Sequence, residues 1–583
     1  MPTTQNNTKK RKLYKSKRYN KRKDKGGGGT KRKRTNHSDA EGVISFTSSL
    51  TPNPSKRTLS LKSKSKKTAT ANANATANAA TVSEPAIAIK SKSKSKSKSK
   101  SPDSMRLQLT QKIIDAFNTR MKNKEEYEKK FSFVGMNVIM KYLKNICPNS
   151  GHCLAFGREN ALIDKYFDFF NDFAYVDPAS ITTINSGENG FITAMDFVRD
   201  RYKVSTILKT AKKVDSDNIF YEAFVGLAYI NEQNNYFPCF LKTYNLFQFN
   251  EPAYRTRLEH PERHRSDLAP DSLNAGLKKL GMNDADTINT SCSSPTQITL
   301  LLQFIENPIQ LYKWLYEQLK NPAQCEYMFS VEIVCILFQV YSVLSAISDE
   351  FTHYDLHSGN VLLYQVPDSK YVTMKYHMPD GPTVVFKTRY IAKIIDYGRC
   401  YTKHTPELYT NVICKAPSCS SAQNIISNGR LYQIPCGESN GFNFFFKTQT
   451  EDNFFISSRV RNKSHDLRLA TLVYQVFLEN DVRNKYPKTR TLHTLMKEIY
   501  ENYDPRDYYK GDKYGTPENI QYSVNDFALD LFMVMTQEFA GNNYFKRAQN
   551  NFYTSGFGSR MECAGTFEIW LARNNPMKFT PMV

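Results

Sequence analysis

Alternating hydrophobic and polar positions predict strands in the middle of the chain. Residues 181–184 and 203–209 are rich in β-branched side chains, residues 203–209 also alternate in polarity, and apolar runs follow at 237–244 and 297–305. This pattern is typical of strands that bury one face. We therefore expect a sheet in this part of the chain.

Apolar stripes at helical spacing predict helices on both sides of these strands. They occur near residues 105–117 and 162–173, at 220–227, and at 329–347. Polar residues interrupt the last stripe, so it predicts a buried core helix rather than a membrane span. Residues 481–583 are also expected to be helical, and the expected fold class is therefore α+β.

The basic residues of the chain are concentrated near its beginning. The whole chain has 80 Lys+Arg and 56 Asp+Glu, a formal net charge of +24. Residues 1–100 hold 27 of the basic and 4 of the acidic residues, which leaves 80 − 27 = 53 basic and 56 − 4 = 52 acidic residues elsewhere. The remainder is nearly neutral, and the excess positive charge belongs to a tail.

Residues 1–104 have the composition of a disordered tail. They contain basic clusters at 9–12 and 31–34, a glycine run at 26–29 and a Ser-Lys alternation from 90 to 101. Such a segment has too few apolar side chains to offset the entropy lost on ordering. Its charge suits nucleic acid or another polyanion, or nuclear import, and a solvated tail without a single partner fits equally well.

The sequence favours a reducing compartment and predicts neither secretion nor a membrane partner. The N-terminus has no apolar segment of the kind that directs secretion. The 11 cysteines of the chain show no disulfide-like framework.

Two acidic motifs follow apolar runs in the second half of the chain. Asp355 lies in a loop five residues before Asn360, and Asp396 directly follows Ile394 and Ile395. This layout is typical of phosphoryl transfer, in which one Asp orients the attacking hydroxyl. Asn360 and Asp396 are then expected to hold Mg²⁺, a hard cation that prefers oxygen ligands.

These motifs resemble those of the protein-kinase superfamily. Residues 353–360 (HYDLHSGN), 396–398 (DYG) and 464–468 (SHDLR) carry the resemblance, which covers roughly 150–480. Together with 189–192 (NGFI), they are also similar to kinase-like proteins of giant nucleocytoplasmic, mimivirus-like DNA viruses. The resemblance implies a bilobal fold with an antiparallel-sheet N-lobe and a mainly helical C-lobe. It also implies an intracellular location, in the host cytoplasm, the nucleus or the virion.

The resemblance implies that several upstream residues bind ATP. Gly187 and Gly190 lie in a turn whose backbone can approach phosphates. Lys209 resembles the strand lysine that contacts the phosphates, although an exposed lysine at a strand end is an alternative. Glu222 resembles the helix glutamate that holds this lysine, and Glu306 begins the implied hinge beside adenine. The implied cofactors are ATP and Mg²⁺.

Other positions of the resemblance concern the loop that carries Asp355, the implied catalytic residue. Asp466 resembles the aspartate that binds the backbone of this loop. Tyr354 stands where many kinases have an Arg that pairs with a phosphorylated activation loop, and His357 stands where Ser/Thr kinases usually have Lys. The sequence around His357 is similar to the loop of aminoglycoside and choline kinases, so the acceptor stays open.

The expected domain organisation follows from these elements. A disordered tail, a helical extension, an N-lobe and a C-lobe are expected at 1–104, 105–180, 181–306 and 307–583. Insertions are expected at 251–296 in the N-lobe, and at 365–390 and 402–463 in the C-lobe.

The favoured function is an ATP-dependent protein kinase directed to Ser or Thr hydroxyls. A small-molecule phosphotransferase and a pseudokinase scaffold are alternatives on the same fold, and a nucleic-acid-binding protein is an alternative that rests on the tail alone. The pseudokinase is disfavoured because Lys209, Glu222, Asp355, Asn360 and Asp396 are all present. Fold alone does not decide among these functions.

We predict that residues 1–104 can be deleted without loss of the fold or of nucleotide binding, because every motif lies beyond them. Deletion should instead weaken binding to polyanions such as DNA, and this loss should be largest at low salt. Salt titrations of DNA binding and thermal unfolding, each with the full and the shortened chain, check this. A shortened chain that is insoluble or unfolded would place the boundary elsewhere.

Overall fold

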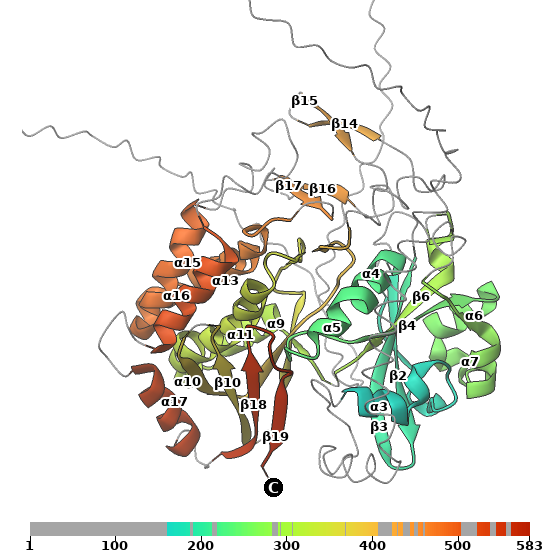
Figure 1. Cartoon of the computed structure of the whole chain (residues 1–583), viewed down its shortest axis with the longest axis horizontal. Coiled ribbons are helices and arrows are strands. Elements are labelled where there is room, and N and C mark those ends of the chain that lie inside the picture. The colour runs from blue at the N-terminus through green and yellow to red at the C-terminus, as the bar shows by residue number, and fades with distance from the viewer. Residues whose placement is uncertain are drawn as a thin grey trace, which may run out of the picture. The chain divides into compact units, whose positions relative to one another are not determined.

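The computed structural model of the chain is an α+β structure with an antiparallel sheet and helices (Figure 1). It describes residues 160–186, 190–212, 219–282, 290–291, 293–305, 307–367, 369–379, 381–405, 423–427, 430–434, 443–447, 453–458, 461–502, 522–536, 544–555 and 561–582. The expected tail at 1–104, most of the expected extension at 105–180, Gly187 and Glu306 lie outside these residues.

Six strands form an antiparallel sheet in the order β1-β2-β3-β6-β4-β5. Their bounds are β1 Thr182–Ser186, β2 Gly190–Arg199, β3 Tyr202–Ala211, β4 Thr243–Phe249, β5 Leu277–Lys279 and β6 Ile298–Gln303. Strand β3 lies inside the sheet, between β2 and β6, and most of its side chains are buried.

Alternate residues of these strands pack into two different clusters, one on each face of the sheet. Ile207 and Leu300 belong to the large cluster that includes helix α4 (Ile219–Val225), whereas Leu208 and Leu301 belong to the second cluster. The second cluster also receives side chains from α3 (Asn160–Tyr166), α6 (Pro252–Glu259) and α7 (Pro270–Gly276).

The polar segment 251–296, expected as an insertion, takes part in this core. It supplies the edge strand β5 and the buried side chains of Leu258, Leu268 and Leu273. Its few leucines face the sheet while its polar residues face away, so its composition hides its packing role.

The strand predicted at 237–244 is misplaced, because the fourth strand begins only at Thr243. Just before it, Phe240 makes an isolated parallel bridge with Ile394, and the Ile394 amide donates to the Cys239 carbonyl at 2.6 Å. This backbone is therefore paired with a segment distant in sequence rather than with the sheet.

The helical stripe predicted at 162–173 ends early, at Tyr166. Asp168, Phe169 and Phe170 have positive φ angles of 50°, 60° and 52°, which a right-handed helix excludes. The Asn245 side chain donates to the Phe170 carbonyl at 2.6 Å and so stabilises this turn.

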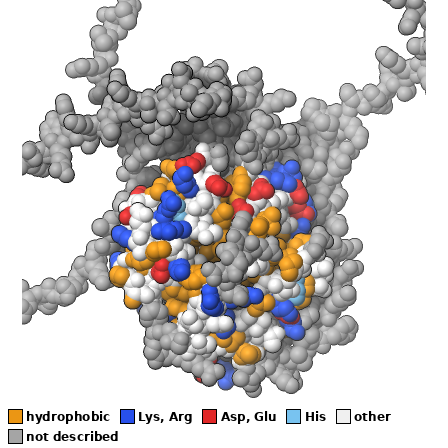
Figure 2. Space-filling view, turned by 90° about the vertical axis from the view of Figure 1, so that its left-hand side faces the viewer, with side chains coloured by type: hydrophobic (Ala, Val, Ile, Leu, Met, Phe, Trp, Pro, Cys, Tyr) orange, Lys and Arg blue, Asp and Glu red, His pale blue; other side chains and the backbone are white. Residues whose placement is uncertain are grey.

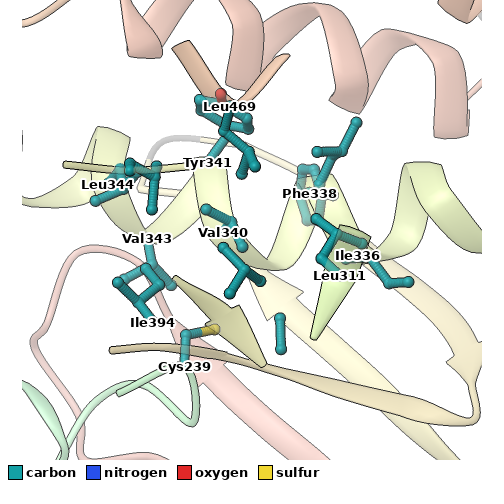
Figure 3. Packing of buried hydrophobic residues seen from close by; sticks show 14 of the residues in the cluster. Cys239, Leu311, Ile336, Phe338, Val340, Tyr341, Val343, Leu344, Ile394 and Leu469 are labelled. Atoms are coloured by element: carbon teal, nitrogen blue, oxygen red, sulfur yellow. The ribbon is translucent and has the colours of Figure 1, made fainter. Parts of the chain in front are cut away.

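Helix α11 (Ile333–Ala346) lies at the centre of the second part of the chain, by which we mean the residues from 307 onward. Its side chains are buried from Ile333 to Leu344 and share a cluster with Leu311, Ile394 and Leu469 (Figure 3). By length and composition, Pro322–Ala346 could cross a membrane, but 94% of its most apolar window is buried inside the protein. The predicted core helix is therefore present.

The structure has further helices and short strands along the chain. The helices are α5 Asn231–Gln233, α9 Leu311–Leu319, α10 Pro322–Tyr327, α13 Arg468–Glu479, α14 Val482–Lys485, α15 Arg490–Asn502, α16 Val524–Thr536 and α17 Tyr544–Ser555. The strands are β7 Ile309–Gln310, β8 Phe351–Thr352, β9 Val361–Gln365, β12 Tyr390–Ile394, β13 Tyr401–Thr402, β14 Gln423–Ser427, β15 Arg430–Ile434, β16 Asn443–Lys447 and β17 Asn453–Ser457. On the face drawn in Figure 2, basic and acidic side chains lie among hydrophobic ones.

A second sheet corrects the expectation that 481–583 is helical throughout. The hairpin of β10 (Lys370–His377) and β11 (Thr383–Thr388) lies within the segment 365–390. β18 (Glu562–Trp570) pairs in parallel with β10, and β19 (Lys578–Pro581) pairs antiparallel with β18 (Figure 1). The alternating burial along β18 is the strand signal that the helical prediction overlooked.

The carboxylate of Glu350 connects the C-terminal segment to two other parts of the chain. Arg573 donates to it from both terminal nitrogens, at 3.0 and 3.2 Å. Lys403 Nζ lies 3.0 Å from Oε1, and the Tyr229 hydroxyl donates to Oε2 at 3.2 Å. Burial alone would raise the pKa of Glu350, but Arg573 and Lys403 lower it to about 2.

We predict that Glu350→Gln lowers the free energy of unfolding at neutral pH by about 1–3 kcal/mol, because charged hydrogen bonds are lost. A lowered carboxyl pKa stabilises the fold above its ordinary pKa near 4.5, so the difference from wild type should narrow as the pH falls towards about 2. Thermal or denaturant unfolding of both proteins at several pH values measures this difference in the free energy of unfolding.

Glu568→Gln is the matched control, since Glu568 makes a partly exposed pair with Lys375 at 2.8 Å. Its effect should stay below about 1 kcal/mol. Equal destabilisation by the two substitutions would show that the Glu350 network contributes no more than a surface pair.

Candidate functional site

Lys209 lies between two carboxylates that come from distant parts of the chain. It sits on the internal strand β3, opposite Ile192 of β2 and Leu300 of β6. Its Nζ is 2.7 Å from Oε2 of Glu222 on α4 and 2.7 Å from Oδ1 of Asp396. The Glu222 side chain is only 1% exposed, so the lysine is paired with a buried charge rather than pointing into solvent.

Asp396 follows β12 in an unusual backbone conformation. Its φ is 71°, in the left-handed region that non-glycine residues rarely occupy. Tyr397 holds this turn, since its hydroxyl donates to the Ile394 carbonyl at 2.7 Å and accepts the Leu241 amide at 3.0 Å. Burial raises the pKa of Asp396, but the charge and hydrogen bond of Lys209 outweigh burial and lower it, so the carboxyl is ionised at neutral pH.

Asp466, which lies just before α13, binds the backbone of the loop 353–360. Its Oδ2 accepts the His353 amide at 2.8 Å, and its Oδ1 accepts the Tyr354 amide at 3.0 Å. Tyr354 has a φ of 64°, so this pair of hydrogen bonds stabilises a strained turn directly before Asp355. The backbone contact that the resemblance implied for Asp466 is present.

Two further hydrogen bonds join this loop to the Asp396 segment. The His353 ring contacts the Ile395 carbonyl through Nε2 at 2.9 Å, and the Ile395 amide donates to the Asn360 carbonyl at 3.0 Å. The Asn360 side chain donates from Nδ2 to the Asp355 carbonyl at 2.9 Å. This bond fixes the Asn360 amide and leaves its oxygen as the group that can bind a cation.

Asp355 is surrounded by positive charge. Arg468 Nη1 donates to its Oδ1 at 2.9 Å, and Arg399 Nε lies 3.6 Å from its Oδ2. Burial by itself raises the pKa of Asp355, but Arg399 and Arg468 outweigh it and hold the pKa well below the usual range. The carboxylate therefore stays ionised although its side chain is only 17% exposed.

Tyr354 and His357 are the two departures from the kinase pattern. The Tyr354 side chain is buried, and the His357 ring is hydrogen-bonded within its own loop. Tyr354 is 1% exposed, and its ring lies 4.8 Å from that of His465. The His357 ring accepts the Gly359 amide through Nδ1 at 3.0 Å, and burial lowers the pKa of this histidine. His357 thus carries no lysine-like charge at neutral pH.

The nucleotide side of the predicted site is described only in part. Gly190 opens β2, and a Cβ there would lie 2.5 Å from the Thr210 carbonyl oxygen, so a larger residue would push β2 from β3. Gly187 and Glu306 lie outside the described residues. Next to Glu306, Asn307 has a φ of 53°.

Neither a protein-family model nor a curated protein matches the chain. The chemistry of the site therefore rests on its own geometry.

The oxygen ligands fit a magnesium ion that is shared with a phosphate-bearing ligand. Asp396 supplies an ionised carboxylate, and Asn360 supplies an amide oxygen. In the described part of the chain, no three His, Cys, Asp or Glu side chains form a group that could hold a metal. Mg²⁺ is commonly bound in this way, by one or two protein oxygens together with phosphates and water.

Sequence reasoning brought together Lys209, Glu222, Asp355, Asn360 and Asp396, but it missed the two arginines beside Asp355. A signal for both existed in the sequence. Arg399 directly follows the Asp-Tyr-Gly motif, and Arg468 lies two residues after Asp466. A basic residue so close to each motif has to lie near the acidic loop once the motifs meet.

Proposed function

We propose that this chain is an ATP-dependent protein kinase with a kinase-like bilobal fold, which transfers the γ-phosphate of ATP to a Ser or Thr hydroxyl. The observation that carries the proposal is that Lys209 Nζ lies 2.7 Å from both Glu222 and Asp396. The backbone next to Asp396 is in turn hydrogen-bonded to Asn360, whose side chain donates to the Asp355 carbonyl. A lysine, a glutamate, an Asp followed five residues later by an Asn, and a second Asp, in this order along the chain, match the parts that phosphoryl transfer needs.

The roles of the nucleotide-binding residues follow from charge. Lys209 binds phosphate oxygens of ATP, and Glu222 keeps its ammonium in place from the buried side. Asn360 and Asp396 hold Mg²⁺, which neutralises charge on the phosphates when it is bound. Gly190 keeps β2 close to β3.

Asp355 acts on the acceptor. Its ionised carboxylate accepts a hydrogen bond from the acceptor hydroxyl and orients the oxygen towards the γ-phosphorus. The new O–P bond forms as the bond from the γ-phosphorus to the bridging oxygen breaks, ADP leaves, and the hydroxyl proton passes to Asp355. The low pKa of Asp355 makes orientation its main contribution, since a weakly basic group holds a proton only briefly.

A small alcohol is the second candidate acceptor. The Asp355-Leu356-His357 sequence favours it, since His357 lacks the charge of the lysine found in Ser/Thr kinases. Transfer of labelled phosphate to a mixed panel of proteins and small alcohols distinguishes the two acceptors. A scaffold that binds ATP without transfer would label neither.

We predict that ATP with Mg²⁺ raises the thermal unfolding midpoint of the protein. A ligand that binds only the folded state stabilises it by about 2.7 kcal/mol at a hundred times its Kd. Lys209→Met should abolish the shift. Lys212→Met should keep it, because Lys212 pairs with Glu259 at 2.8 Å instead of with the site carboxylates. A folded wild type without a shift at millimolar ATP would contradict nucleotide binding.

We predict that Asp355→Asn lowers kcat by ~10²–10⁴, because the amide lacks the charge that orients the acceptor hydroxyl and cannot take its proton. The ATP-dependent thermal shift should persist, because Asn360 and Asp396 are unchanged. Steady-state kinetics and thermal unfolding on the same preparation separate the two effects. Wild-type turnover in Asp355→Asn would exclude the proposed mechanism.

A further inference from the structure

Arg468 makes a contact that the proposed mechanism has not used. It is the first residue of α13, and its side chain is 12% exposed. Its Nη1 donates to Asp355 Oδ1 at 2.9 Å, a charged hydrogen bond of good length across 113 residues of sequence. On the other oxygen, Arg399 Nε lies 3.6 Å from Oδ2, which is longer than a hydrogen bond.

The same short segment also holds the backbone of the loop. Asp466, two residues before Arg468, accepts the His353 and Tyr354 amides at 2.8 and 3.0 Å. The segment 466–468 therefore fixes both the backbone before Asp355 and one oxygen of its carboxylate. A carboxylate with one oxygen fixed has a defined direction for the other, so rotation about its last bond is restricted.

We propose that Arg468 is a positioning residue for Asp355, fixing Oδ1 so that Oδ2 is presented to the acceptor hydroxyl. The inference rests on the proposed function. Arg399 adds a second charge at longer range. It follows Asp396 by three residues, so the charge near Oδ2 belongs to the segment that carries the metal ligand.

A purely structural role would also explain a buried pair, since a mostly buried carboxylate needs a partner. The two roles differ in which kinetic parameter they change. Loss of structure affects ATP binding and turnover together, whereas loss of orientation lowers kcat and leaves ATP binding intact. A positioning residue also has no effect once the group that it positions has been removed.

The experiment measures kcat, KM for ATP and the ATP-dependent thermal shift for wild type, Arg468→Gln, Arg468→Lys and Arg461→Gln. Arg461 is the matched control, because it makes an exposed pair with Asp349 at 2.7 Å that Lys463 also contacts. Arg468→Gln should lower kcat about 10- to 100-fold, the loss expected for one charged hydrogen bond, with the thermal shift unchanged. Arg468→Lys should recover part of kcat, and Arg461→Gln should match wild type.

The double variant Asp355→Asn with Arg468→Gln tests the route of the effect. It should be as slow as Asp355→Asn alone, within about threefold. Losses that multiply would overturn the inference, as would an Arg468→Gln kcat within about twofold of wild type or a matching loss of ATP binding. If Arg468→Gln does not fold, Arg468→Lys decides, and wild-type kcat in that variant overturns the inference.

Failure of the proposed function gives a different result. A folded wild type that transfers phosphate to no member of the acceptor panel overturns the kinase proposal, and this inference with it. A wild type that transfers phosphate while Arg468→Gln is unaffected overturns only the inference.

Discussion

The site depends on one constraint, that the buried carboxylate of Glu222 must be paired. The cost of burying an unpaired charge is several kcal/mol, and Lys209 on β3 is the cation that meets Glu222, at 2.7 Å. The same ammonium lies 2.7 Å from Asp396, so the pair that stabilises α4 against the sheet also ties the sheet to the second part of the chain. Movement of α4 would separate Glu222 from Lys209 and so remove the contact that holds the ammonium from the buried side.

Two residues of the candidate site have a strained backbone, which side chains of neighbouring elements stabilise. Tyr354 and Asp396 have φ angles of 64° and 71°, each of which costs about 1–3 kcal/mol for a non-glycine residue. Asp466 holds the first turn through two amides, and the Tyr397 hydroxyl holds the second. Tyr397 is buried in the core, so its hydroxyl can hold the backbone of this turn by hydrogen bonds to Ile394 and Leu241.

The sequence predicts which residues of the candidate site lie close together better than it predicts the fold around them, for a physical reason. Asp355, Asn360 and Asp396 each lie in a short motif that carries the resemblance, so the resemblance implied that they come together. The pairing of β18 with β10 could not be predicted, because the two strands pair in parallel, as Met374 with Phe567, and nothing local signals so distant a partner. The contact of Arg468 with Asp355 was missed although Arg468 lies two residues after Asp466, since the direction of its side chain depends on how α13 packs against the loop.

The charges around the site argue that a phosphate-bearing ligand needs an accompanying cation. Lys209, Arg399 and Arg468 lie against Glu222, Asp355 and Asp396, so these three positive charges are matched by three negative ones. A polyphosphate brings several more negative charges into a site whose cations are already paired, and repulsion from Asp355 and Asp396 opposes it. Lys209 can turn towards a phosphate only if another cation takes its place beside Asp396. In the proposed mechanism, Mg²⁺ held by Asp396 and Asn360 would meet that need, and the metal would then be a condition of tight nucleotide binding as well as of transfer.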